Sequence, residues 1–225
     1  MIVDFLLDRY KPGYVEVIGS ISVQVIYLLT GLVMERLRPR YRSDTTSKMI
    51  VESFRNHVVA TAMHFGYVTY RAGQPVLSWD FPRPYHLPPW QVMARDVVIG
   101  LVIRDVLFWV IHRLWHLPGI YQLVHAKHHE LKDPTAHHVF TISYMSVVDF
   151  IILYGSLVVA VAKGLNMDIS TALTFAFISA VGEQVKLVWG DEKHDEHHAD
   201  GSVNFGVYGF TDWVLGTASS EFPLP

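Results

Sequence analysis

Residues 15–34 of the chain read VEVIGSISVQVIYLLTGLVM and carry one charged residue, Glu16, near their start. Twenty helical residues extend over about 30 Å, the thickness of the hydrocarbon core of a bilayer. The stretch that follows, ERLRPRYR, carries four arginines, and such a basic stretch favours the cytoplasmic side. We therefore predict a first membrane-spanning helix that ends in the cytoplasm. The alternative is a buried helix of a soluble protein with a basic end.

Four further stretches have the length of a membrane span. Residues 139–160 contain Asp149 as their only charged residue. Residues 49–70, 93–111 and 166–189 contain several charged side chains each, and such segments span a bilayer only when those side chains face a bundle interior. We expect an all-α integral-membrane helical bundle of about four or five spans.

The composition agrees with this class of fold. Apolar residues make up 51% of the chain and charged residues 17%, against about 25% charged in an average soluble domain. A length of 225 residues predicts a single domain, residues 1–225. The net charge of −3, with no basic stripe, does not favour a nucleic-acid partner. Because the chain has no cysteine, any metal must be bound through nitrogen or oxygen.

Eight of the thirteen histidines lie in three short clusters. The clusters are His112-x3-His116, His125-x2-His128-His129 and His194-x2-His197-His198. Residues three and four apart share one face of a helix, so each cluster can direct two or three imidazoles to one point. With five spans, all three clusters fall on the cytoplasmic side of the membrane.

Imidazole nitrogen is a common metal ligand, and eight imidazoles exceed the three or four that one zinc ion takes. Two metal ions therefore account for the clusters better than one. Iron, zinc, copper and nickel all accept imidazole, so spacing alone leaves the metal open. The single histidines His57, His64 and His86 have no partner at ligand spacing, and we expect them to be structural.

The surroundings of the clusters carry a resemblance to a known family. The stretches are DVLFWVIHRLWH (105–116), HAKHHELKDPTA (125–136) and HDEHHADGSVNFGVYGFTDWVLGT (194–217). Together they resemble the fatty acid hydroxylase and sterol desaturase superfamily, which comprises integral-membrane, non-haem di-iron enzymes. The resemblance covers roughly residues 100–217, about half of the chain. It is specific for fold and metal centre and says little about the substrate.

The resemblance implies a helical membrane bundle with a cytosolic, histidine-rich cap that holds a two-metal site. It also implies a set of metal ligands and a metal. The implied ligands are His112, His116, His125, His128, His129, His194, His197 and His198. The implied cofactor is a pair of iron ions, with zinc as the alternative. Asp105 lies seven residues before His112 and could orient a ligand imidazole through a hydrogen bond, or it could form an ion pair with Arg104 or with a neighbouring helix.

Two departures from the family pattern stand out. The family often has a further histidine after the second cluster, where this chain has none, although His137 and His138 lie just before that position and could act as extra ligands. Ahead of the third cluster the family commonly has another histidine, where this chain has Glu183 and its neighbours. Glu183 could bind or support a metal, or it could pair with Lys186 at a spacing of three.

The resemblance implies an oxygen-dependent oxidoreductase that hydroxylates or desaturates an unactivated C–H position. The substrate would be lipid-like, such as a sterol, a fatty acyl chain or a hydrophobic secondary metabolite, bound between apolar helices in contact with membrane lipid. No GxGxxG motif is present, so we expect electrons to come from a partner protein. The resemblance implies that this partner is cytochrome b5 with its reductase, or another reductase chain. In a eukaryote we expect the endoplasmic reticulum membrane, with the metal site facing the cytosol.

Two other functions remain open at this stage. One is a zinc-dependent membrane hydrolase, in which zinc activates water and Glu196 or Asp195 acts as the base. The other is a non-catalytic partner subunit stabilised by metal. The number of clustered histidines argues against the second, because a structural zinc needs only about four ligands.

Overall fold

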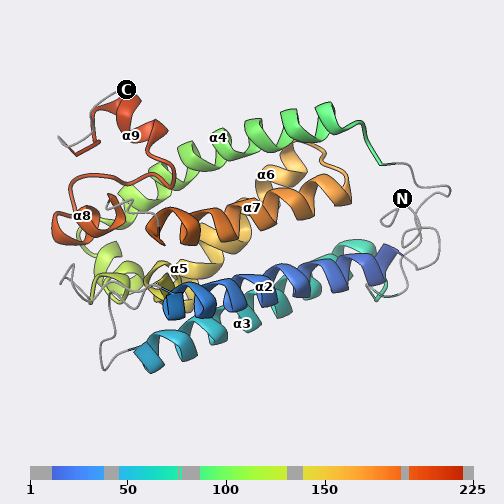
Figure 1. Cartoon of the computed structure of the whole chain (residues 1–225), viewed down its shortest axis with the longest axis horizontal. Helices are drawn as coiled ribbons and strands as arrows, with labels where there is room; N and C mark the ends of the chain where they lie inside the picture. The colour runs from blue at the N-terminus through green and yellow to red at the C-terminus, as the bar shows by residue number, and fades with distance from the viewer. Residues whose placement is uncertain are drawn as a thin grey trace.

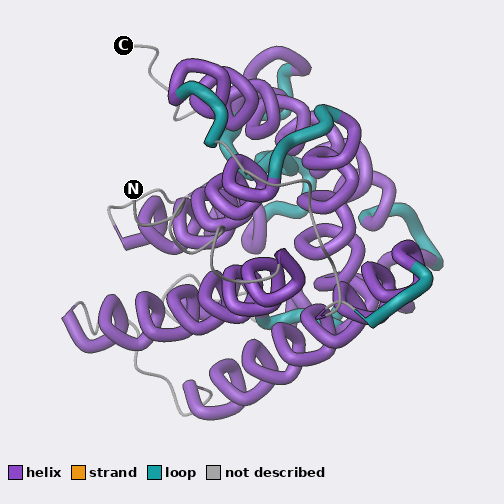
Figure 2. Tube along the Cα trace, turned by 90° about the vertical axis from the view of Figure 1, so that its right-hand side faces the viewer, coloured by secondary structure: helices purple, strands orange, loops and turns teal. Residues whose placement is uncertain are grey.

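The structure is a computed structural model that describes residues 12–37, 46–75, 77, 87–130, 139–188 and 193–219. Throughout these ranges the regular elements are helices, and no strand occurs (Figure 2). The long helices are α2 (Pro12–Leu37), α3 (Thr46–Ala72), α4 (Trp90–Trp115), a continuous helical run over residues 147–164, and α7 (Ile169–Val188). The all-α expectation is confirmed.

These five helical segments alternate in direction along one axis (Figure 1). α2 ends where α3 begins, α4 returns to that end, and α7 returns there after the run 147–164. The same end carries α8 (Lys193–Ala199) and α9 (Phe210–Leu215). The three histidine clusters therefore lie at one end of the bundle, as the sequence predicts.

The fourth helix begins later than the predicted range 139–160. Residues Val139–Ser143 form a short, buried 3₁₀ helix. The helical conformation is then interrupted, and the next helix begins after Ser146. The Ser146 hydroxyl accepts a hydrogen bond from the Asp149 amide at 3.1 Å and so caps the new helix. This helix consists of α5 (Val147–Phe150), a π-helical segment Ile151–Ser156 (η6) and α6 (Leu157–Gly164).

A short turn joins α6 to α7. Asn166 adopts a positive φ of 50°, which asparagine tolerates better than most residues. The Asp168 carboxylate then accepts hydrogen bonds from the amides of Ser170 and Thr171, at 2.8 and 3.2 Å. A short turn and an N-terminal cap thus return the chain along the bundle.

Close helix packing holds the histidine end together. A Cβ at Gly31 of α2 would lie 2.6 Å from the Phe140 ring, so only glycine allows this approach. Phe108, Trp115, Leu153 and Leu157 form a buried cluster below the histidines. This cluster joins α4, which carries the first histidine cluster, to the helix 147–164, and Val124 of the segment that carries His125 packs against it.

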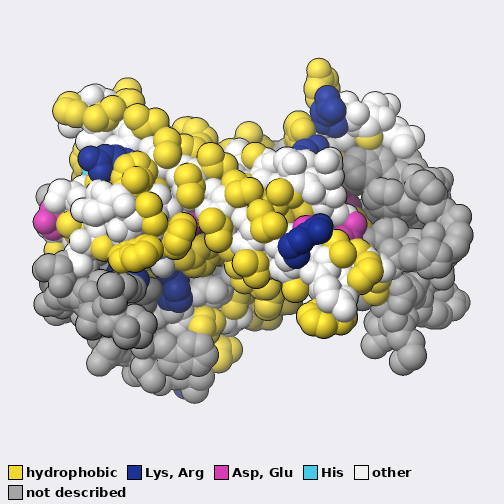
Figure 3. All heavy atoms as spheres, turned by 90° about the horizontal axis from the view of Figure 1, so that it is seen from above, with side chains coloured by type: hydrophobic (Ala, Val, Ile, Leu, Met, Phe, Trp, Pro, Cys, Tyr) yellow, Lys and Arg dark blue, Asp and Glu magenta, His cyan; other side chains and the backbone are white. Residues whose placement is uncertain are grey.

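The outer surface is that of a membrane protein. Two helical stretches, Gly13–Arg36 and Val147–Gly164, are long and apolar enough to cross a bilayer. Large apolar side chains along α2, including Ile18, Leu29 and Val33, are more than half exposed. Hydrophobic side chains also cover much of the face seen in Figure 3. The chain is an all-helical membrane bundle with a histidine-rich cap at one end.

Candidate metal centre

Three separate segments deliver the clustered histidines. His112 lies in the last turn of α4, and His116 follows one turn later at the end of that helix. His125 ends the π-helical segment Tyr121–His125 (η2), and His128 and His129 begin the 3₁₀ turn that follows. The third cluster lies on α8. All eight histidines of the three clusters lie among the described residues.

The structure brings these histidines together in two neighbouring groups. The first group comprises His112, His116, His125, His129 and His197, and the second comprises His128, His194 and His198. Within each group one nitrogen of every ring lies within 4.8 Å of all the others. The rings of His129 and His198 stack at 4.4 Å, which places the two groups side by side.

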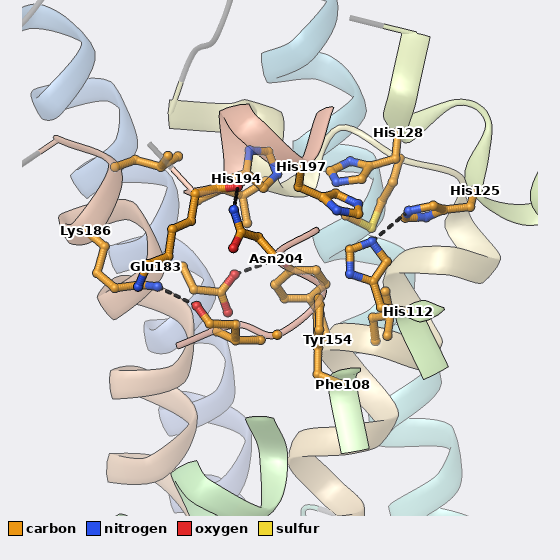
Figure 4. Close-up of a pocket in the computed structure, with 17 residues that line it drawn as sticks. Phe108, His112, His125, His128, Tyr154, Glu183, Lys186, His194, His197 and Asn204 are labelled. Atoms are coloured by element: carbon orange, nitrogen blue, oxygen red, sulfur yellow. Dashed lines mark hydrogen bonds between the residues drawn. The ribbon is translucent and has the colours of Figure 1, made fainter. Parts of the chain in front are cut away.

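The spacing of the ring nitrogens fits metal ligation. The Nε2 atoms of His112 and His125 are 2.9 Å apart, and those of His116 and His197 are 3.1 Å apart. Nitrogens bound to one ion at about 2.1 Å, at right angles to each other, would be ~3.0 Å apart. Figure 4 shows His112, His125, His128 and His197 pointing toward a common region.

The opposite nitrogen of four rings donates to a fixed acceptor. Nδ1–H of His112, His197 and His128 donates to the backbone carbonyls of Phe205, Val203 and Tyr144, at 2.7, 2.6 and 3.1 Å. These bonds set the tautomer, so that the Nε2 lone pair faces the centre.

The fourth ring is held by a carboxylate. Nδ1–H of His125 donates to the carboxylate of Asp149 at 2.7 Å, and Asp149 is fully buried. This role was missed in the sequence analysis, although a lone charge in an apolar segment is a recognised functional signal.

Burial keeps the clustered imidazoles neutral. Removal from water lowers the pKa of His116 to about 4, of His197 to about 3 and of His125 to about 2, and in His125 the neighbouring histidines lower it further. The pKa values of His128 and His198 also fall well below 6.5, again chiefly through burial. Neutral rings keep the lone pairs that a metal needs.

Asp105 serves neither of the two roles predicted for it. Its carboxylate accepts hydrogen bonds from the Tyr208 amide at 2.6 Å, and from the amide and hydroxyl of Thr211 at 2.8 and 2.6 Å. It therefore holds the segment that leads into α9. Its effect on the histidines is indirect, because Phe205, whose carbonyl binds His112, lies just ahead of that segment.

Asp212 holds the same loop from the other side. Its carboxylate accepts hydrogen bonds from the amides of Phe205 and Gly206, at 2.8 and 2.7 Å, and from the indole N–H of Trp109, at 3.1 Å. Two buried carboxylates thus fix the short stretch that supplies the carbonyl for His112.

Glu183 is absent from both histidine groups, and it does not pair with Lys186 as the sequence analysis proposed. Its Oε1 accepts from the Arg104 guanidinium at 2.7 Å, and its Oε2 accepts from the Tyr154 hydroxyl at 2.8 Å. Lys186 instead donates to the Val207 carbonyl. The packing of α4 against α7 brings Arg104 to Glu183. The spacing of Glu183 and Lys186 along α7 gives no information about this contact.

Two of the remaining histidines, His57 and His64, lie among the described residues. His57 binds the Ser53 carbonyl at 2.8 Å and stacks on Tyr27, which agrees with a structural role. His64 pairs with Glu16 at 2.6 Å. His86, His137 and His138 lie outside the described residues.

The bases suggested for a hydrolase are engaged elsewhere. Oε2 of Glu196 accepts from the Asn204 amide at 2.8 Å and from the Ser219 hydroxyl, and these bonds tie α8 to the loop behind it. Asp195 pairs with its neighbour His194 at 3.8 Å.

Comparison with known proteins identifies the family. The fatty acid hydroxylase family model matches residues 97–217, more than half of the chain. Human "Fatty acid hydroxylase domain-containing protein 2" is 32% identical over 147 residues, which cover 62% of this chain and 43% of that protein. The macaque protein of the same name matches at 30% over the same shares, so the chain spans less than half the length of these two relatives.

Two plant proteins match over more of their length. "Very-long-chain aldehyde decarbonylase GL1-8" from Oryza sativa subsp. japonica is 27% identical, and "Methylsterol monooxygenase 2-2" from Arabidopsis thaliana is 23% identical. Each alignment covers 95% of this chain and 89% of the plant protein. No solved structure matches the chain. The matched region contains all three histidine clusters, and the chain belongs to the fatty acid hydroxylase family.

Proposed function

We propose that this protein is a membrane-bound, oxygen-dependent oxidoreductase that hydroxylates or desaturates an unactivated C–H position of a lipid-like substrate. The observation that carries the proposal is the pair of adjoining imidazole groups, one of five and one of three rings, with four outer nitrogens held by fixed acceptors. The names of the matched relatives refer to fatty acids, aldehydes and methylsterols, which supports a lipid substrate.

The donor set fits two metal ions, and we propose iron. Three rings suffice to hold one ion with an open position, and the group of five can hold the second. Two bound iron ions would supply oxygen activation. The chain itself would bind the ions through Nε2 atoms, fix those rings through the carbonyls and Asp149, and exclude water behind the apolar cluster of Phe108, Trp115 and Leu153.

The proposed reaction requires an electron donor and a defined orientation of the histidine end in the membrane. We propose that a separate donor, such as cytochrome b5 with its reductase, supplies electrons from the aqueous side. We also propose that the histidine end faces the cytosol, and in a eukaryote that the membrane is the endoplasmic reticulum. Arg36 in the last turn of α2, at the histidine end, and the arginines that follow it in the sequence support this orientation.

The test is metal analysis combined with oxygen uptake. The full chain is purified from cells grown with iron, its metal content is measured by mass spectrometry, and oxygen uptake is followed with a reductase system and separate fatty acid, fatty aldehyde and sterol substrates. We expect about two iron ions per chain and substrate-dependent oxygen uptake that ends in an oxidised product. His197→Ala should lose both, whereas Gln122→Ala, at an exposed side chain, should keep both.

Three results would contradict the proposal. Zinc without oxygen uptake, together with hydrolysis of a lipid ester or amide, would identify the hydrolase. A protein that binds metal but neither consumes oxygen nor hydrolyses a lipid would be a partner subunit. In that case co-expressed enzymes would form the same amount of product with His128→Ala as with the wild type. Full activity in His197→Ala would show that the histidine groups take no part in the reaction.

A further inference from the structure

A large cavity lies inside the bundle, beside the metal centre but separate from it. It has a volume of about 510 Å³, within the range of small-molecule sites. Small and apolar side chains form most of its wall, among them Val23 of α2, Ala60 of α3, Gly155 and Leu173. A Cβ at Gly155 would meet only the Ala60 methyl group, at 3.9 Å, so small residues create the space here.

One edge of the cavity reaches the outer surface. Met63 and Tyr67 of α3, and Ala160 and Lys163 of α6, line the cavity and are exposed. Lys163 donates to the Tyr67 hydroxyl at 3.0 Å across this mouth. The two most apolar helical stretches of the protein, α2 and residues 147–164, both contribute to the wall. The cavity is therefore placed to receive an apolar molecule from the bilayer.

A second, much smaller cavity lies against the histidines. Its volume is about 60 Å³, and its lining includes His112, His125, His128 and His197. A water molecule occupies about 30 Å³ of liquid, so this space holds little more than the end of a chain. Figure 4 shows Tyr154 and Phe108 beneath the histidines in this region.

Tyr154 is the one described residue that lines both cavities. It lies in the π-helical segment Ile151–Ser156, and such irregular turns occur frequently at functional sites. Its ring stacks on Phe150 at 5.4 Å and packs edge-on to Phe108 at 5.9 Å. Tyr154 therefore stands between the large cavity and the histidines.

A buried ion pair holds Tyr154 in this position. The Tyr154 hydroxyl donates to Glu183, which lines the small cavity, and Glu183 is paired with Arg104, which lines the large one. Arg104 is completely buried, and a buried charge at membrane depth is expensive unless it is paired. These three residues form a polar wall between the two cavities.

We propose that the large cavity binds the apolar chain of a lipid substrate that enters between α3 and α6, and that Tyr154 is the specificity-determining residue that limits how far the chain reaches toward the histidines. The nine residues from Lys163 to Tyr154 correspond to about 13 Å of helix, so the mouth and the wall can contact distant parts of one elongated molecule. This inference rests on the proposed function for the chemistry, but the binding site can be tested without it.

The cavity is tested by photolabelling. The purified protein is illuminated with stearic acid that carries a diazirine in mid-chain, and the labelled residues are mapped by mass spectrometry. We expect label on cavity-lining residues such as Ala60, Ala176 and Val158. Gly155→Leu fills the cavity and should reduce this label about tenfold. Val148→Phe adds bulk to the same helix at a residue that is 53% exposed, and it should change nothing.

Labels confined to outward-facing residues, or equal labelling in wild type and Gly155→Leu, would overturn the cavity assignment. A sterol carrying a diazirine serves as the competing probe. If only the sterol labels the cavity, the acyl-like chain is the wrong occupant and the proposal fails in that form.

The role of Tyr154 is tested with a diazirine at the end of the chain. In the wild type we expect little label in the small cavity, whereas Tyr154→Ala and Tyr154→Leu should label residues there, such as Leu153 and Val207, several-fold more. Val158→Ala enlarges only the large cavity and is the matched control. Retained mid-chain label in both Tyr154 variants would show that they are folded. Unchanged labelling of the small cavity in these variants would overturn the role of Tyr154.

The activity assay separates this inference from the proposed function. With an active enzyme, Tyr154→Ala should move the oxidised carbon along the chain without changing metal content. If no variant oxidises any lipid while the labelling follows the expected pattern, the proposed function fails and the binding site stands. An active enzyme with unlabelled cavity residues would reverse that conclusion.

Discussion

At the scale of single residues, hydrogen bonds from the outer nitrogens of four rings orient the clustered imidazoles. The candidate ligands are easier to identify from the sequence than the groups that orient them. The eight histidines could be found because their spacing places them on shared faces. The carbonyls of Phe205, Val203 and Tyr144 could not, because any residue has a carbonyl and only the fold brings it to a ring. Asp149 is an intermediate case. The sequence shows its isolated charge in an apolar segment but does not show that His125 is its partner.

Asp149 gives the first prediction. Its carboxylate holds Nδ1–H of His125 and increases the basicity of the ring. Asp149→Asn keeps the shape but loses the charge, and we expect metal affinity to fall about 10- to 100-fold, with a larger loss in Asp149→Ala. Metal retention against a competing chelator measures this. Asp96→Asn, at a surface carboxylate on α4 paired with Arg95, is the control. Equal retention in all three variants would show that the bond to His125 does not support the metal site.

Gly206 gives the second prediction. A Cβ at this position would lie 2.8 Å from Asp212 and 3.0 Å from Asp105, the two carboxylates that hold the loop behind His112. We expect Gly206→Ala to destabilise the protein by about 1–3 kcal/mol and to weaken metal retention, because the Phe205 carbonyl must shift. Gly182→Ala is the matched control, since its Cβ would meet nothing within 4 Å and alanine favours the helix. A Gly206→Ala protein with unchanged melting temperature would contradict this account.

At the scale of helices, the sequence predicted the elements but misplaced one boundary. Length and apolar composition placed α2, α3, α4 and α7 within a few residues. The fourth helix was predicted to begin at residue 139, because the apolar residues 139–143 continue the pattern although they form a separate buried turn. The sequence Ser146-Val-Val-Asp149 resembles a capping box, and this signal would have identified the true start.

The cap itself gives the third prediction. The Ser146 hydroxyl accepts from the Asp149 amide and donates to the Val124 carbonyl at 2.8 Å, so it joins the start of the fourth helix to the segment that carries His125. Ser146→Ala should lower stability by about 1 kcal/mol, which corresponds to about 2–4 °C in melting temperature for a chain of this size. Ser156→Ala, within the same helix, should have little effect. A melting temperature equal to that of the wild type would exclude this role for the hydroxyl.

At the scale of the whole molecule, the histidine cap depends on rings that are buried and neutral. In the metal-free protein His116, His197 and His125 have pKa values of about 4, 3 and 2, below the 6.5 of an exposed histidine. Between pH 6.5 and about pH 4 the unfolded chain therefore binds more protons than the native one. Stability must fall as the pH falls through this window, because protons then favour the unfolded state.

This linkage gives the last prediction. When the pH falls from 7.5 to 5.5, the metal-free protein should lose about 1.4 kcal/mol for each histidine that stays neutral in the native state, and its melting temperature in detergent should fall accordingly. Metal-loaded protein should be more stable at pH 7.5 and should lose that advantage as protons compete for the same nitrogens. Melting curves with and without chelator across this range measure both effects. A metal-free melting temperature that is constant or rises toward pH 5.5 would mean that the clustered rings are not held neutral by burial.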